Sequence, residues 1–164
     1  MRRQLTLFVQ KNDAKYIEDI RCKFNPQQSE IINSHVTLCR EDEIENIDQV
    51  LHNLTQLEQK KININFGQVA RFDNGKGVFI PAISNNNKFH QLRSLILKGV
   101  NDNPRRQEPH ITLMHPRNST CTDKIFEQIL KIETPNKLTF NKIAIIEQEG
   151  NNTWKIIKEI ELIN

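Results

Sequence analysis

The sequence predicts an α+β fold in which antiparallel sheets carry helices on their outer faces. Short segments with the alternating pattern of β-strands are interspersed with longer segments that have the period of amphipathic helices. The sequence Asp-Asn-Gly at residues 73–75 predicts a tight hairpin turn, which joins two antiparallel strands. The order strand, helix, strand, helix, hairpin occurs twice. We therefore expect a single domain over residues 1–164 with two internally similar halves.

The first half is expected to contain two strands and two helices before the hairpin. Residues 5–9 form the first strand, and Asn12 or Asp13 caps a helix that Asn25-Pro26 ends. A loop at residues 27–29 leads to the second strand. The second helix has acidic residues in its first turn and lysines at its end, where the helix dipole favours each charge. The apolar faces of the two helices are formed by Tyr16, Ile17, Ile20 and Phe24, and by Ile44, Ile47, Leu51, Leu54 and Leu57.

The hairpin and the second half continue this pattern. Residues 62–72 alternate as a strand that enters the hairpin, and residues 78–81 form the return strand. Gly99 is the expected C-terminal stop of the next helix. The apolar faces of the last two helices are formed by Phe89, Leu92, Leu95 and Ile96, and by Ile125, Phe126, Ile129 and Leu130. The elements that complete the chain are strands at residues 138–146 and 154–162, joined by a turn at Gly150-Asn151-Asn152.

Composition narrows the class of protein. A chain of 164 residues can bury a core without disulfides or metal. The net charge of +3 favours a local anion site over a surface that coats nucleic acid nonspecifically. The three cysteines include no C-x-x-C pair, which predicts neither a disulfide framework nor a zinc site. With no apolar run of membrane-spanning length and no signal-peptide core, we expect a cytoplasmic monomer without membrane contact.

Two short segments carry the candidate chemistry. His35-Val36-Thr37-Leu38 and His110-Ile111-Thr112-Leu113 both have the pattern His, apolar, Thr, apolar, and both lie in predicted strands. Because residues i and i+2 of a strand share a face, each His and its Thr project together while the apolar residues enter the core. Chance would produce such a pair on the order of 1% of the time, so a functional interpretation is favoured. Together the segments supply an acid, a base and two hydroxyl donors.

The two motifs resemble those of the 2H phosphoesterase superfamily, which includes the 2′-5′ RNA ligases and cyclic phosphodiesterases. The resemblance covers essentially the whole chain in size and element order. It implies a bilobed α+β fold of two pseudo-symmetric antiparallel sheets, with outer helices, around a central cleft. It also implies metal-independent chemistry, with no cofactor, on 2′,3′-cyclic or 2′,5′-linked phosphates of an RNA terminus or a nucleotide.

The resemblance assigns roles to individual residues. The catalytic histidines of the family correspond to His35 and His110, and its phosphate-contacting hydroxyls to Thr37 and Thr112. The residues after the two motifs are not alike, since Arg40 follows the first motif whereas His115 and Arg117 follow the second. We expect these three residues to be additional substrate contacts.

The motif residues suggest in-line displacement at phosphorus, with one histidine as base and the other as acid. The unperturbed pKa of histidine, about 6.5, suits both roles. The two threonines would hold the non-bridging phosphate oxygens, and a flanking arginine would add a charge-assisted contact. The sequence leaves open which histidine is the base.

Several alternatives remain at this level. Phe79, with Phe72 beside it, is a candidate for stacking on a base, although large aromatic side chains are more often buried in the core. A zinc site built from His110, His115 and a third ligand lacks the tight cluster that zinc needs, so no metal is expected. A non-catalytic module that binds RNA or nucleotide on the same fold, and RNA 2′-5′ end joining, are the competing functions.

Overall fold

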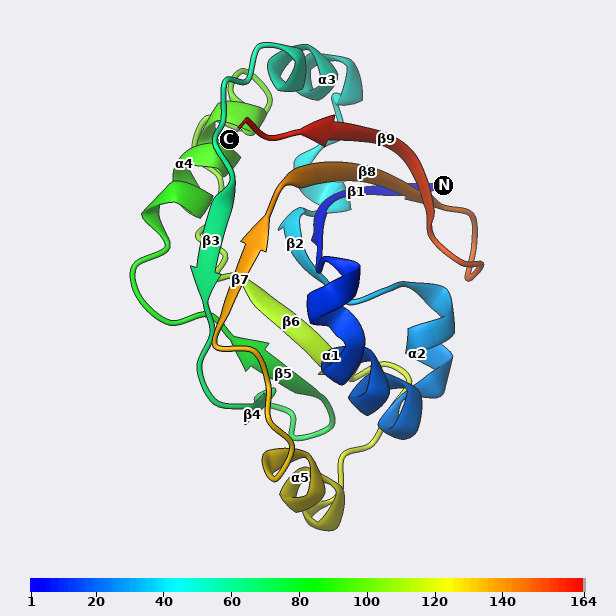
Figure 1. Cartoon of the computed structure of the whole chain (residues 1–164). Helices are drawn as coiled ribbons and strands as arrows, with labels where there is room; N and C mark the ends of the chain where they lie inside the picture. Colours follow the sequence, from blue (N-terminus) through cyan, green and yellow to red (C-terminus); the bar gives the residue numbers. More distant parts are fainter. Residues whose placement is uncertain (164) are drawn as a thin grey trace.

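The computed structural model describes residues 1–163 and has the predicted α+β architecture (Figure 1). Its larger sheet is antiparallel and has seven strands in the order β4-β5-β6-β2-β1-β8-β9. In that order the strands span Ala70–Arg71, Val78–Pro81, His110–Met114, His35–Cys39, Arg2–Phe8, Lys142–Gln148 and Lys155–Glu161. A second sheet pairs β3 (Ile62–Asn65) with β7 (Lys137–Phe140).

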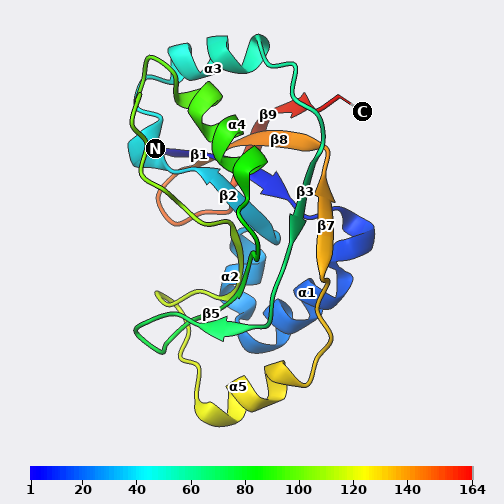
Figure 2. The same cartoon turned by 90° about the vertical axis from the view of Figure 1, so that its left-hand side faces the viewer.

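The helices are distributed around these sheets. Figures 1 and 2 show α3 and α4 at one end of the molecule and α5 at the opposite end. Helices α1 and α2 follow each other in the chain and pack together. The helices are α1 (Lys11–Phe24), α2 (Pro26–Ile31), α3 (Ile47–Thr55), α4 (Asn87–Leu97) and α5 (Asp123–Leu130), with a short 3-10 helix η1 (Glu41–Glu43).

The two halves of the chain have corresponding places in the sheet. The order is symmetric about the boundary between β6 and β2, because β5 and β1 lie next to them, followed by β4 and β8. The registers correspond as well: Phe8 lies opposite His35 as Pro81 lies opposite His110, and each strand pair has a bulge at the equivalent position. Strands β3 and β7 complete the correspondence by pairing with each other. Each His motif therefore occupies an equivalent position in its half.

The halves join where β2 pairs with β6, in a register that places Val36 opposite Ile111. The expected pair of similar sheets thus takes the form of two halves of one continuous sheet, with β9 added at one edge. The apolar residues of both motifs point into the core and are at most 1% exposed, whereas the histidines and threonines are half-buried on the other face. This alternation is the one that the sequence predicts.

The prediction of a loop at residues 27–29 is wrong, since these residues lie in helix α2. Asn25-Pro26 ends α1, as predicted, but Pro26 also occupies the first position of α2, where its missing N–H costs nothing. The carbonyl of Asn25 accepts hydrogen bonds from the N–H groups of Gln28 and Ser29 and so begins the new helix. Helix α1 itself begins at Lys11 after Gln10, so Asn12 and Asp13 lie inside it rather than at its cap.

Two predicted long strands are interrupted. The strand expected at residues 62–72 is divided into β3 and β4, and the strand expected at residues 138–146 is divided at Asn141 into β7 and β8. In both cases the two parts belong to different sheets, which an alternating pattern alone does not distinguish. The helix expected from Ile44 to Leu57 is shorter, because Ile44 is buried beside η1 and α3 starts at Ile47.

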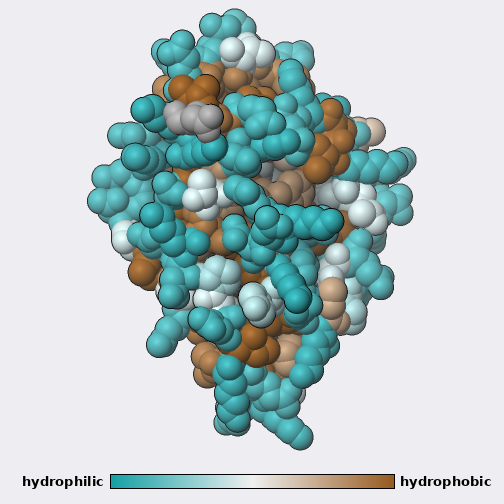
Figure 3. All heavy atoms as spheres, viewed as in Figure 1, coloured by the Kyte–Doolittle hydropathy of each residue, from teal (hydrophilic) through white to brown (hydrophobic). Residues whose placement is uncertain are grey.

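Most predicted apolar helix positions face the core, and three do not. Tyr16, Leu95 and Leu130 are about half or more exposed. Polar side chains cover most of the face in Figure 3, and apolar patches between them are small. Among the described residues, no helix combines the length and apolarity needed to cross a membrane.

Candidate functional site

The four motif side chains meet at the centre of the larger sheet. Since Val36 lies opposite Ile111 in an antiparallel pair, His35 lies across from Thr112, and Thr37 across from His110. All four line one cleft of about 710 Å³ on the same face of the sheet. The cleft thus receives two equivalent His-Thr pairs in reciprocal orientation.

Each histidine is oriented by the same backbone contact. The Nδ1–H of His35 donates to the carbonyl oxygen of Asn33 at 2.7 Å, and the Nδ1–H of His110 donates to that of Glu108 at 3.2 Å. In both cases the acceptor lies two residues before the histidine. This contact places the proton of the neutral ring on Nδ1 and leaves Nε2 available for proton transfer.

A buried clamp holds the backbone before His35. Arg21, which is 1% exposed, donates to the carboxylate of Glu18 at 2.7 Å and to the carbonyl of Ile32 at 2.6 Å. The second carboxylate oxygen of Glu18 accepts the backbone N–H of Ser34. Residues on both sides of Asn33 are therefore anchored to α1, which fixes the carbonyl that orients His35.

Arg21 also lines the cleft and was not among the predicted site residues. The sequence contains a signal for it, because Arg21 follows Ile17 by four residues and so lies within the apolar stripe of the predicted helix. A charged residue in such a stripe is buried only when it is paired, as Arg21 is with Glu18.

His110 has two aromatic neighbours, whereas His35 has one, the Phe8 ring at 6.0 Å. The rings of Phe72 and Phe79 stack with centroids 4.5 Å apart, and both meet the His110 ring edge-on, at 5.9 and 5.6 Å. Phe72 lines the cleft, whereas the predicted substrate contact Phe79 is not among its lining residues. Phe79 instead supports Phe72 and His110 from β5.

The pKa of each histidine in the cleft is lowered from its ordinary value. Burial is the main cause and brings the pKa of His35 to about 4; the Asn33 carbonyl opposes the shift, and Arg21 and the other two imidazoles of the cleft reinforce it. Burial also lowers the pKa of His110, with a smaller contribution from Arg40. Both rings are therefore neutral near pH 7 until an anion between them favours protonation.

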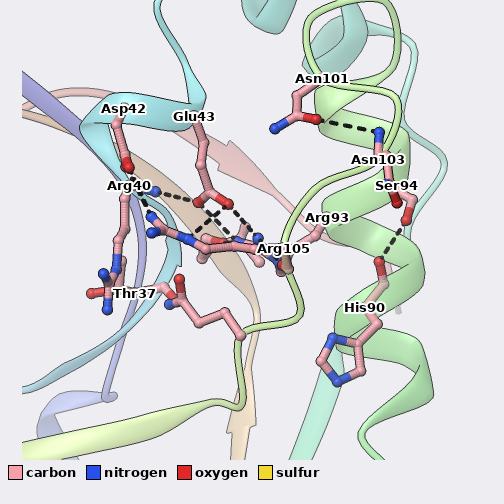
Figure 4. A network of polar contacts seen from close by, with 12 residues as sticks. Thr37, Arg40, Asp42, Glu43, His90, Arg93, Ser94, Asn101, Asn103 and Arg105 are labelled. Carbon is pink, nitrogen blue, oxygen red and sulfur yellow. Dashed lines mark hydrogen bonds and ion pairs between the residues drawn. The ribbon is translucent and has the colours of Figure 1, made fainter.

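A second buried ion pair positions the end of β2 (Figure 4). Arg93 on α4 contacts Glu43 at 2.6 Å and also donates to the carbonyl of Leu38. Glu43 in turn accepts the backbone N–H of Arg40 at 2.9 Å, so that Arg40 leaves the strand toward the cleft that it lines. On the neighbouring segment, the amide of Gln107 donates to the carbonyl of Thr37 at 3.0 Å.

The segment after the second motif is anchored from the first half of the chain. The side-chain oxygen of Asn25, which is 2% exposed, accepts the N–H of His115 at 2.8 Å, and its amide donates to Asn118. His115 and Arg117 line the cleft, and burial lowers the pKa of His115, with Arg117 adding to the effect. The structure thus brings His35, Thr37, Arg40, His110, Thr112, His115 and Arg117 into one cleft.

Arginines dominate the charges around the histidines. Arg21, Arg40 and Arg117 line the cleft, and Arg2 lies farther along it. Among the residues that the structure describes, no group of three or more His, Cys, Asp or Glu side chains is arranged to hold a metal ion. The arrangement therefore suits an anion that carries oxygens for the threonines and lies between two neutral imidazoles.

A family model matches most of the chain. The model of the 2′-5′ RNA ligase superfamily matches residues 9–152, and the chain belongs to this family. The matched region includes both His motifs and the segments that anchor them. Comparison with curated protein sequences gives no match.

Solved structures with the same fold accompany this match. The structure of E. coli LigT in its apo form is 15% identical, with a TM-score of 0.71 over 99% of this chain and 98% of that one. The complex of E. coli LigT with 3′-AMP has the same identity, coverage and TM-score. A structure described as a phosphoesterase is 14% identical over 99% of both chains, also with a TM-score of 0.71. At these identities the similarity establishes the fold.

Proposed function

We propose that this protein is a metal-independent phosphodiesterase that acts on 2′,3′-cyclic or 2′,5′-linked phosphates of RNA ends or nucleotides. The main support is the reciprocal arrangement of two neutral imidazoles, each with its Nε2 available, on either side of a threonine pair in a cleft lined by arginines. Membership of the 2′-5′ RNA ligase superfamily supports the reaction class. The solved complexes of E. coli LigT with 3′-AMP and with phosphate support a nucleotide phosphate as ligand.

In the proposed reaction, one histidine takes a proton from water as the water oxygen forms a bond to phosphorus. The P–O bond on the opposite side breaks, and the other histidine donates a proton to the leaving oxygen. For a 2′,3′-cyclic phosphate the products are a phosphomonoester and a free hydroxyl on the same ribose. Thr37 and Thr112 donate hydrogen bonds to the non-bridging oxygens, where negative charge increases in the transition state.

The proton needed by the acid enters with the substrate. In the free protein both histidines have lowered pKa values, so neither is substantially protonated at pH 7. A phosphate between the rings favours their charged forms and raises the pKa of the ring that becomes the acid. Substrate binding should therefore be coupled to proton uptake, which calorimetry in buffers of different ionisation enthalpy would detect.

Metal independence is proposed from the donor set. The charged groups nearest to both imidazoles are arginines, which repel cations, and among the described residues no three His, Cys, Asp or Glu side chains are grouped to hold a metal ion. The test is hydrolysis of a 2′,3′-cyclic nucleotide with excess EDTA, compared with 2′,5′-linked dinucleotides. Turnover that persists in EDTA supports the proposal, whereas binding without turnover of any of these substrates would indicate a non-catalytic module.

End joining is the second candidate, because the same groups serve it when the 5′-hydroxyl of a second RNA replaces water. The base takes the hydroxyl proton as the 5′-oxygen bonds to phosphorus, and the acid protonates the ribose oxygen released when the cyclic P–O bond breaks. The superfamily name supports end joining directly. Incubation of an RNA with a 2′,3′-cyclic end and an RNA with a 5′-hydroxyl end distinguishes the two reactions, since joining yields a longer product and hydrolysis yields a phosphomonoester end.

A further inference from the structure

The cleft extends well beyond the two His motifs. Its far part runs along β1 toward the turn between β8 and β9 and is lined by Arg2, Gln4, Gln148, Asn151 and Trp154. On β1, Arg2 lies four residues before Thr6, whose partner in the register is Thr37. Side chains of a strand alternate, so Arg2, Gln4 and Thr6 share the face that carries the cleft, at about 13 Å from one end to the other. This distance exceeds the phosphate-to-phosphate repeat of one nucleotide.

Arg40 occupies the middle of this path. Since Leu5 lies opposite Cys39, the next residues along the two strands, Gln4 and Arg40, also come side by side. Both line the cleft. Among the described residues, no carboxylate lies within ion-pair distance of Arg40, so its charge is available to a ligand.

The side chains at the far end of the cleft are held in place by contacts with one another and with the backbone. The guanidinium of Arg2 lies 5.5 Å from the centre of the Trp154 ring and donates to Gln148, whose side chain is 3% exposed. The amide of Gln148 donates to the carbonyl of Asn152 at 2.6 Å, and the N–H of Trp154 donates to the carbonyl of Ile31 at 2.9 Å. A cation and an aromatic ring are thereby held together at one place.

Two carboxylates border the same region and limit its positive charge. Glu41 lies 3.8 Å from Arg2, and Asp42 is paired with Arg105 at 2.9 Å. Both line the cleft. Because each carboxylate already faces an arginine, the region keeps the charge of Arg40 and part of the charge of Arg2.

We propose that this region, which we call the β1 groove (Arg2, Gln4, Arg40, Gln148, Asn151 and Trp154), binds a single-stranded oligonucleotide that leads to the reactive phosphate. The proposal rests on the function proposed above and specifies its substrate as the end of an oligonucleotide rather than a free nucleotide. Arg40 and Arg2 contact successive backbone phosphates, and a base stacks at the Arg2–Trp154 pair, a mode that tolerates any sequence. The exposed amide of Asn151 and the Gln4 side chain are available to the sugar and base edges.

The test compares two substrates that have the same 2′,3′-cyclic end but differ in length, a pentanucleotide and a mononucleotide. The ratio of kcat/KM for a pentanucleotide with a 2′,3′-cyclic end to kcat/KM for the 2′,3′-cyclic mononucleotide is expected to be at least about tenfold in the wild type. Arg2→Ala and Trp154→Ala should each lower this ratio about tenfold, and Trp154→Phe should restore part of it because it keeps a stacking ring. Removing the phosphate contact of Arg2 should also reduce the salt dependence of oligonucleotide binding by about 0.7 in the log–log slope.

Arg3→Ala is the matched control. Arg3 neighbours Arg2 on the same strand but points to the opposite face, where it pairs with Glu147 at 2.8 Å. It should leave the ratio unchanged. A wild-type ratio near one, or equal ratios for Arg2→Ala and Arg3→Ala, would overturn the groove.

Failure of the proposed chemistry is separable from failure of the groove. If no substrate is turned over, fluorescence anisotropy with a labelled 3′-phosphorylated pentanucleotide, competed by a 3′-mononucleotide, measures the same preference. Tighter binding of the pentanucleotide that disappears in Arg2→Ala and is kept in Arg3→Ala supports the groove. Equal binding of both ligands contradicts it.

Discussion

The two halves of this protein place the same residues on the same backbone and then surround them differently. His35 and His110 lie at equivalent points of equivalent strand pairs, and each donates Nδ1–H to the carbonyl two residues earlier. Around His35 that carbonyl is anchored by the buried Glu18–Arg21 clamp. Around His110 it belongs to Glu108, whose side chain is exposed and pairs with Arg106 at 2.6 Å.

This comparison separates the groups that both halves contribute to the reaction from the groups of one half alone, which we relate to substrate binding. The shared elements are the imidazoles and hydroxyls, which a symmetric proton-transfer reaction needs on both sides of the phosphate. Three of the arginines that line the cleft, Arg2, Arg21 and Arg40, come from the half of the chain that carries His35, although Arg40 acts on the His110 ring; the stacked phenylalanines come from the half that carries His110. A polynucleotide is asymmetric about its reactive phosphate, and the cleft has a corresponding asymmetry.

The largest effect is expected from removing either imidazole. His35→Ala and His110→Ala should each lower kcat by about 10²- to 10⁴-fold, because each removes one proton transfer. Steady-state kinetics on a 2′,3′-cyclic nucleotide measures the loss, and circular dichroism checks that the fold is kept. Near-normal turnover in either variant would contradict a reaction that uses both halves.

The second-largest effect is expected from removing the hydroxyl groups of the two motif threonines. Thr37→Val and Thr112→Val keep the shape of the side chain and remove a donor to the phosphate oxygens, so kcat should fall by about 10²-fold in each. A loss confined to KM would show that the hydroxyl acts in binding rather than in the transition state. Similar losses for the two variants are expected, since the two threonines have equivalent places in the sheet.

The clamp gives the sharpest contrast between the halves. Glu18→Gln removes the charge that pairs with Arg21, so the arginine should lower the pKa of His35 further and shift the His35 limb of the pH–rate profile to lower pH. A loss of roughly tenfold in kcat is expected from the looser carbonyl, on the scale of a misplaced catalytic group. Glu108→Gln is the control, because only the backbone carbonyl of Glu108 contacts His110. Identical pH–rate profiles for the two variants would count against the clamp.

Stability toward acid should show the smallest difference. The pKa of His35 is about 4 in the folded state, below its unfolded value of about 6.5, so unfolding takes up a proton between these pH values. The contribution of neutral His35 to the free energy of unfolding is complete above pH 6.5 and is lost as the pH falls toward 4. Between pH 6.5 and pH 4, the free energy of unfolding should therefore fall less in His35→Asn than in the wild type, by as much as about 2 kcal/mol. Urea unfolding at the two pH values measures this difference. His110→Asn should have an effect of the same sign. If the free energy of unfolding depended on pH in both variants as it does in the wild type, the lowered pKa values would be contradicted.

The sequence determined the elements whose signals are local. The alternation of the two motifs is enough to place His35 and Thr37 on one face of a strand, because strand geometry dictates it. The hairpin at residues 73–75 formed as predicted, with Gly75 at a φ of 68° that few other residues adopt. Seven of the eight predicted site residues line the cleft for the same reason, since they lie in or directly after these strands.

Only the tertiary structure decided which groups surround the motifs. The division of residues 138–146 between two sheets, the helix that starts at Pro26, and the arrival of Arg21 and Arg93 behind the histidine strand depend on contacts between segments far apart in the chain. A buried charge is stable only with its partner in place, and neither a residue pattern nor a propensity identifies that partner. The different surroundings of His35 and His110 therefore became visible only when the chain was folded.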